Sequence, residues 1–88
     1  MNLVRRLLSL LLTRRYQATD HALEGLDDDQ LSFADVLACL VSGRVRRSWP
    51  RQRKYEVEGR AVDGRRVRVI VRLLPGPRVR IITVYEVY

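Results

Sequence analysis

The stretch Arg65–Val87, RRVRVIVRLLPGPRVRIITVYEV, decides the fold class of this chain. Its first half alternates arginines with aliphatic residues at a period of two, which is typical of a strand with one buried face. Pro75-Gly76-Pro77 then interrupts the pattern, and a second run rich in β-branched residues follows. Two such runs joined by a short turn containing Gly and Pro predict an antiparallel hairpin.

The residues before this hairpin extend it into a sheet. The predicted strands are Arg44–Trp49, Lys54–Val62, Arg65–Leu73 and Arg78–Val87. Asp63-Gly64 is expected to form the turn between the second and third of these strands, since this dipeptide favours tight hairpins. Residues 44–88 are therefore expected to form an antiparallel sheet of roughly four strands.

Residues 1–15 have helical periodicity instead and predict an N-terminal amphipathic helix. Its apolar residues cover most of its girth and leave only a narrow polar stripe, so two sides of the helix need to be covered. Packing against the domain and a second copy of the chain is the favoured explanation, and a position in a membrane interface is the alternative. The apolar run is far shorter than the roughly 20 residues that span a bilayer, so integral membrane insertion is not expected.

Residues 16–43 are expected to be mainly helical, after a short extended piece over residues 14–18. Thr19 can cap a short helix that Gly25 and the acidic cluster Asp27-Asp28-Asp29 interrupt. Ser32 and Asp35 resemble a capping box, with Asp in place of the usual Glu, for a stronger helix over Phe33–Val41. The helix over Phe33–Val41 is therefore expected to be the last one before the sheet begins.

Gly43 is expected to end that helix in a left-handed conformation. Helices that precede a run of strands predict an α+β fold, in which the helices cover one face of the antiparallel sheet. The whole chain, residues 1–88, is expected to be a single domain. This domain is expected to consist of the N-terminal amphipathic helix (1–15), a helical part (16–43) and the antiparallel sheet (44–88).

The composition favours a folded protein with a polyanionic partner. The chain has 17 Lys and Arg against 10 Asp and Glu, a net charge of +7, and 47% hydrophobic residues. Charge of this size favours association with nucleic acid, an anionic membrane or an acidic protein. Cys39 is the single cysteine, so no disulfide within the chain is expected, and a cytoplasmic location is the default expectation.

The basic residues gather in the sheet half, and RNA is the partner that we expect to bind them. Aromatic residues stand among them and can stack on unpaired bases, as single-strand binders require. The alternative is that these arginines only keep a sheet face soluble. The predicted RNA-binding residues are Lys54, Arg66, Arg68, Arg72 and Arg80.

His21 is the only histidine and the first candidate for a general acid or base. The alternative is a structural histidine near a helix end. Motifs for nucleotide hydrolysis, acyl transfer and metal binding are absent from the sequence, so no cofactor and no metal are expected. RNA cleavage through the 2′-hydroxyl needs only a base, an acid and cations that stabilise the phosphate, which His21, a tyrosine, Lys54 and the arginines would supply.

Several short motifs occur in an order that resembles a known family. They are Thr19-Asp20-His21-Ala22, Leu31-Ser32, Asp35-Val36, Gly43, Tyr55 with Gly59, and Ile81-Ile82-Thr83-Val84-Tyr85. Over about residues 16–88, the chain is similar to the family called domain of unknown function 4258, a set of small prokaryotic proteins that resemble RelE/ParE toxins. The resemblance implies helices on a twisted antiparallel sheet, ribonuclease or toxin activity, and neutralisation by an antitoxin.

The resemblance also implies site residues. His21, Thr83 and Tyr85 match the family's polar positions and are the expected catalytic residues. Family members commonly carry arginines near the histidine, and this chain has Gly25 and Asp29 in that region instead. This departure weakens the expected phosphate stabilisation beside His21.

The sequence therefore supports two hypotheses. The first is a small basic RelE-like domain that acts as a metal-independent ribonuclease or toxin of a toxin–antitoxin system. The second is a non-catalytic module that binds RNA or a protein. The expected partners are RNA, an acidic antitoxin protein and a second copy of the chain bound through the N-terminal helix. Which sheet face carries Thr83 and Tyr85 stays open, because both faces of the last strand are largely apolar.

Overall fold

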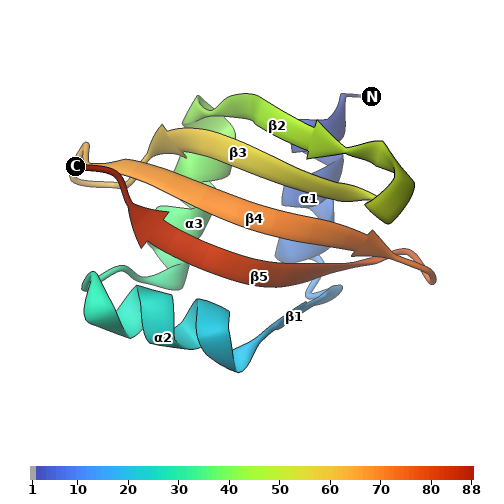
Figure 1. Cartoon of the computed structure of the whole chain (residues 1–88), viewed down its shortest axis with the longest axis horizontal. Coiled ribbons are helices and arrows are strands. Elements are labelled where there is room, and N and C mark those ends of the chain that lie inside the picture. The colour runs from blue at the N-terminus through green and yellow to red at the C-terminus, as the bar shows by residue number, and fades with distance from the viewer. Residues whose placement is uncertain (1) are drawn as a thin grey trace.

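The computed structural model describes residues 2–88 and contains helices packed on a five-stranded sheet (Figure 1). The elements are α1 (Leu3–Leu12), β1 (Tyr16–Ala18), α2 (Asp20–Asp28), α3 (Phe33–Ser42), β2 (Arg44–Trp49), a 3₁₀ turn (Pro50–Gln52), β3 (Lys54–Arg60), β4 (Arg66–Leu74) and β5 (Arg78–Glu86). The strand order is β1-β5-β4-β3-β2. The predicted α+β class is confirmed.

The expectation of four antiparallel strands is wrong, because β1 adds a fifth strand that is parallel to β5. The N–H of Val79 donates to the carbonyl of Arg15 at 3.0 Å, and the N–H of Thr19 donates to the carbonyl of Ile81 at 3.0 Å. A segment of only three residues is too short to show a period of two. The extended piece expected over residues 14–18 is present, and its pairing with β5 makes Tyr16–Ala18 a strand of the sheet.

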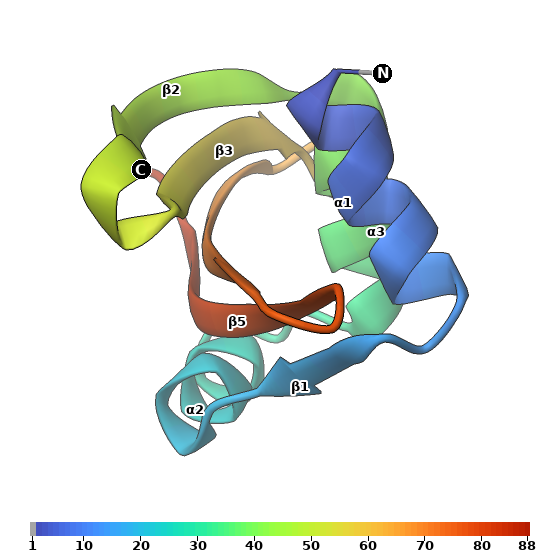
Figure 2. The ribbon, with the colours of Figure 1, turned by 90° about the vertical axis from the view of Figure 1, so that its right-hand side faces the viewer.

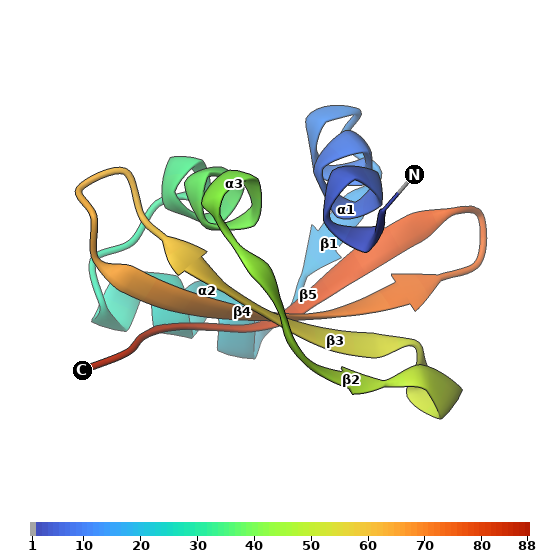
Figure 3. The ribbon, with the colours of Figure 1, turned by 90° about the horizontal axis from the view of Figure 1, so that it is seen from above.

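Helices α1 and α3 cover one face of the sheet (Figure 3). Leu7, Leu10 and Leu11 of α1 are buried, and they join a core to which α3 contributes Val36 and Leu40. Packing within the domain therefore accounts for one side of α1. Leu12 stays 67% exposed, and the homodimer through this helix stays a prediction. Met1 lies outside the described residues, and no helix of residues 2–88 is long and apolar enough to cross a membrane.

Helix α2 ends at Asp28, within the acidic cluster that was expected to interrupt it, whereas the expected interruption at Gly25 is wrong. It lies along the outer edge of β5 beyond the end of β1 (Figure 1). A Cβ atom on Gly25 would overlap the carbonyl oxygen of Val84 in β5. Gly25 therefore permits a close approach between helix and strand, and it does not end the helix.

The two ends of α3 differ in how well the sequence predicted them. The capping box of Ser32 and Asp35 is present, and Asp35 also accepts a hydrogen bond from the N–H of Val62 at 3.0 Å. The prediction that Gly43 adopts a left-handed conformation is wrong, since its φ is −98° and its backbone is extended. A Cβ atom there would overlap the carbonyl of Cys39, so the glycine serves close packing.

A bulge in β5 determines which residues face the helices. Ile70 of β4 pairs with Thr83, whereas the next residue, Val71, pairs with Ile81, so Ile82 is an extra residue. The extra residue shifts the alternation by one, as β-bulges do. Val79, Ile81 and Val84 are buried beneath the helices, and Thr83 and Tyr85 lie on the opposite face.

Candidate functional site

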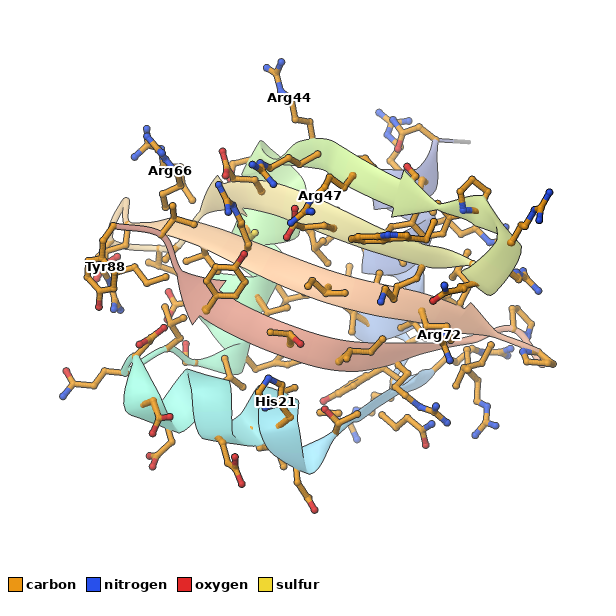
Figure 4. All side chains as sticks on the ribbon, in the orientation of Figure 1. His21, Arg44, Arg47, Arg66, Arg72 and Tyr88 are labelled. Atoms are coloured by element: carbon orange, nitrogen blue, oxygen red, sulfur yellow. The ribbon has the colours of Figure 1, made fainter. Side chains whose placement is uncertain are left out.

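The sheet face opposite α1 and α3, called here the open face, is lined mainly by polar and basic side chains. Cross-strand pairing arranges these side chains in three long rows that run across the sheet, with the pair Arg60 and Arg66 beyond the first row, because directly paired residues share a face. The first row is Arg44-Glu58-Arg68-Tyr85, the second is Arg47-Glu56-Ile70-Thr83, and the third is Trp49-Lys54-Arg72-Arg80-Gln17. Figure 4 views this face, with Arg47 and Arg72 over the sheet and Arg44 and Arg66 extending away from it.

In the first row, Arg68 is bound to partners within the chain. Its Nε donates to Glu58 Oε1 at 2.7 Å, and its Nη1 donates to the Tyr85 hydroxyl at 3.3 Å. The hydrogen bond from Arg68 holds the pKa of Glu58 below its usual value, and the contacts with Tyr85 and Glu58 raise the pKa of Arg68. Arg68 is therefore only partly available to an external anion.

The second row contains a carboxylate with no solvent exposure, Glu56, although no helix covers it. Arg46 Nη1 donates to Glu56 Oε2 at 2.8 Å, and Arg47 Nε donates to the same oxygen at 3.1 Å. Burial alone would raise the pKa of Glu56, but the two arginines outweigh it and the pKa is lowered. The Tyr85 hydroxyl also donates to Glu56 Oε1, at 3.4 Å. Glu56 therefore offsets one of the two positive charges beside it and engages both guanidinium groups.

The third row is different, because it contains no acid. The Lys54 ammonium lies 4.7 Å from the centroid of the Trp49 ring. Arg72 Nη2 makes a long hydrogen bond of 3.5 Å to Gln52 Oε1, and Arg72 Nε is buried without a partner among residues 2–88. Within the same residues, neither Lys54 nor Arg72 pairs with a carboxylate.

Arg80 continues the third row toward β1. With the Gln17 amide oriented so that both its ends are satisfied, its oxygen accepts from Arg80 Nε at 2.9 Å and Nη2 at 3.0 Å. This contact is with a neutral group, so it fixes the guanidinium without cancelling its charge. The positive charge of the third row is therefore available to an anion.

The three predicted catalytic residues lie together. His21, Thr83 and Tyr85 line one hollow of about 290 Å³ between α2 and β5. His21 is exposed on α2, and the β5 bulge brings Thr83 and Tyr85 to the same side of the strand. The other lining residues that carry charge are Glu24, Asp28 and Asp29. The hollow is acidic, in contrast to the third row beside it on the open face.

The predicted RNA-binding residues are divided among different environments. Lys54, Arg72 and Arg80 lie in the acid-free third row, Arg68 is bound to Glu58, and Arg66 is exposed at the start of β4. The sequence did not single out Glu56, Arg46, Arg47 or Gln17. The sequence did contain a signal for the missed carboxylates. Glu56 and Glu58 alternate with Tyr55 and Val57, and this alternation places both carboxylates on the face that bears the arginines.

Within residues 2–88, no three His, Cys, Asp or Glu side chains gather so that they could hold a metal ion.

The fold and the open face define a small α+β protein whose sheet carries a partly neutralised basic surface. The family model for Domain of unknown function (DUF4258) matches residues 18–86, from the end of β1 through β5. The chain belongs to this family, and the resemblance inferred from its motifs is confirmed to that extent. No significant match was found among curated proteins or among solved structures.

Proposed function

We propose that this protein binds RNA through the open face of its sheet. The observation that carries the proposal is the acid-free third row, in which Lys54, Arg72 and Arg80 stand side by side without a carboxylate. Guanidinium groups suit phosphate oxygens because their fork of donors can form paired hydrogen bonds. The net charge of +7 adds long-range attraction for a polyanion.

Single-stranded RNA fits this face better than duplex DNA does. Duplex readers commonly insert a basic helix into the major groove, whereas α3 carries no basic residue. Sheet faces with exposed aromatic and basic side chains can instead stack and hold unpaired bases. Trp49 lies on the open face at the end of the third row.

Fluorescence anisotropy with a labelled single-stranded RNA at several salt concentrations tests this proposal. The variant Lys54→Ala/Arg72→Ala/Arg80→Ala should bind more weakly and lower the slope of log affinity against log salt by about 0.7 for each lost phosphate contact. The control Arg5→Ala/Arg6→Ala/Arg15→Ala removes the same charge from exposed positions in and just after α1. Equal losses in both variants would mean that net charge alone, and not the third row, drives binding.

A second candidate function is metal-independent RNA cleavage by a RelE/ParE-like toxin. The specific observation in its favour is that His21, Thr83 and Tyr85 line one hollow at the edge of the open face. In this proposal His21 transfers the proton, Thr83 and Tyr85 position the phosphate or the leaving group, and the arginines of the open face bind the RNA backbone. An acidic antitoxin would neutralise the protein by covering the same basic face.

Cleavage of a mixed-sequence RNA in the presence of a chelator tests this second function. His21→Ala should abolish turnover and keep RNA affinity, because His21 is exposed and contributes little to folding. Asp20→Asn is the control, since it changes a neighbouring exposed residue that does not line the hollow. Equal turnover by His21→Ala and the parent protein would exclude His21 as the proton-transferring group.

A further inference from the structure

We propose that Trp49, Lys54 and Arg72 form a subsite for one unpaired nucleotide, in which the indole stacks on the base and the two cations hold an adjacent phosphate. The inference rests on the proposed RNA binding and deepens it, because it names the unit that is recognised and the residues that recognise it. It also predicts that single strands bind in preference to duplexes.

Trp49 lies on the open face of the sheet and not in the core. It is the only tryptophan of the chain, and it is not part of the hydrophobic core formed by residues 2–88. Large aromatic side chains contribute much of the burial in most small cores and are also enriched at binding surfaces. Trp49 pairs with Lys54 across the strands and shares the open face with it. Its placement favours contact with a ligand over a structural role in the core.

A hollow lies beside the indole. Trp49 is followed by the 3₁₀ turn Pro50–Gln52, and together with Ser48 these residues line a hollow of about 460 Å³, which Lys54 and Arg72 do not line. This volume lies in the range of about 300–1,000 Å³ that is usual for small-ligand sites. The turn is fixed to the sheet, because the N–H of Leu73 donates to the carbonyl of Arg53 at 2.9 Å. The wall beside Trp49 is therefore formed before a ligand binds.

Two cations lie over the indole ring, the Lys54 ammonium at 4.7 Å and the Arg47 guanidinium at 5.5 Å from the ring centroid. A base that stacks on the indole takes the place of one of them, and the displaced cation then lies beside the base, where it can contact the adjacent phosphate. Arg72 has a buried Nε without a partner among residues 2–88 and only a long contact to Gln52. Buried donors usually have acceptors, so Arg72 is a guanidinium whose hydrogen bonds are incomplete within the chain.

The cations of the third row are closely spaced. Lys54 and Arg72 are directly paired across β3 and β4, which places their Cβ atoms about 5 Å apart. One phosphate can therefore contact both side chains while its base reaches Trp49. Arg80 is the next residue of the same row and is positioned by Gln17, so the following phosphate can continue along the row.

Trp49 gives this proposal a direct readout, because all tryptophan emission of the protein comes from this residue. Three probes are titrated: a single-stranded oligoribonucleotide, the same sequence annealed to its complement, and inorganic polyphosphate. The single strand should quench the emission at the lowest concentration, the duplex should need a higher one, and polyphosphate should bind with little quenching. Quenching by polyphosphate equal to that by RNA would overturn base stacking and leave an anion site only.

Variants separate the subsite from the general proposal. Trp49→Ala should weaken single-strand binding about 10-fold and remove the preference over duplex, since stacking on an aromatic ring is worth roughly that factor. Trp49→Phe keeps an aromatic ring and should keep most of the preference, which excludes misfolding as the cause. RNA binding by anisotropy with unchanged tryptophan emission would overturn the subsite and leave the proposed function standing. Absence of RNA binding by the parent protein would overturn both.

Discussion

Arg46 donates a hydrogen bond of 2.8 Å to Glu56, and this carboxylate is fully shielded from solvent on a sheet face that α1 and α3 leave uncovered. Figure 2 shows the two helices on the other side of the sheet. The shielding therefore comes from side chains of the sheet itself, with Arg47 as the second donor at 3.1 Å. These arginines act first as counter-ions for Glu56, so a count of basic residues overstates the charge that the open face offers to RNA.

Removal of these counter-ions should destabilise the fold. Arg46→Ala/Arg47→Ala leaves a shielded carboxylate without a cation, which typically costs about 3 kcal/mol. Urea unfolding followed by circular dichroism measures this loss, and adding Glu56→Gln to the double variant should restore most of it. Arg44→Ala is the control, because Arg44 is exposed and forms no ion pair within residues 2–88. A double variant as stable as the parent would show that Glu56 does not depend on the pair.

Acid should destabilise the protein through Glu56 and Asp35. Backbone hydrogen bonds from Ser32 and Val62 lower the pKa of Asp35, and Arg46 and Arg47 lower that of Glu56 against the opposing effect of burial. A carboxyl group with a lowered folded-state pKa stabilises the fold fully above its ordinary value, here 3.8 and 4.5. This stability is lost as the pH falls through the lowered pKa values.

The measurement is the free energy of unfolding as a function of pH. Asp35→Asn and Glu56→Gln should each flatten the acid side of the profile, because the substituted group no longer binds a proton on unfolding. Asp20→Asn is the control, since Asp20 is exposed at the start of α2. A profile that keeps the parent's slope in both variants would contradict the assignment.

Gly25→Ala should destabilise the protein, although the same change in an exposed helix normally stabilises by about 1 kcal/mol. The added Cβ atom would overlap the carbonyl oxygen of Val84 and push α2 away from β5. That displacement would also weaken the hydrogen bond between Thr19 Oγ1 and the carbonyl of Ile82, now 2.9 Å. Thermal unfolding compares this variant with Leu23→Ala, a change at a half-exposed position of the same helix. A higher melting temperature for Gly25→Ala would contradict the close approach.

The Cys39 thiol should be unreactive in the folded protein. It is fully buried, its Sγ lies 3.4 Å from the carbonyl oxygen of Val67, and burial raises its pKa to about 12. The thiolate that reacts with alkylating reagents is therefore scarce as well as inaccessible. Mass spectrometry after iodoacetamide treatment should show modification only when a denaturant is present. Rapid modification without denaturant would show that the packing of α3 on β4 opens readily.

Local patterns in the sequence predicted the parts of the fold that depend on neighbouring residues. The alternation of Val67, Val69 and Val71 gave the buried face of β4, and Ser32 with Asp35 gave the start of α3. The pairing of β1 with β5 and the bulge at Ile82 were not predictable in this way, because both depend on contacts between segments far apart in the chain.

In the candidate site, too, local motifs were predictable and features that depend on strand pairing were not. The motif residues His21, Thr83 and Tyr85 do line one hollow, as a shared role requires. The distinction between neutralised and free arginines was missed, because it depends on the register that pairs Glu58 with Arg68 and leaves Lys54 opposite Arg72. Charge composition identifies a basic face, and only the register tells which part of it is open to a ligand.

Hydroxyl-removing variants distinguish the two proposed functions. Tyr85→Phe and Thr83→Val keep the shape of the open face and remove groups that a cleavage reaction would use. If the protein is a ribonuclease, each should lower turnover by about 10²-fold or more while RNA affinity stays near that of the parent. Tyr88→Phe is the matched control, since the Tyr88 side chain is 97% exposed near the end of the chain. Unchanged RNA affinity with no turnover in the parent or in any variant would leave RNA binding through the third row as the function, and the hollow between α2 and β5 would then have no catalytic role.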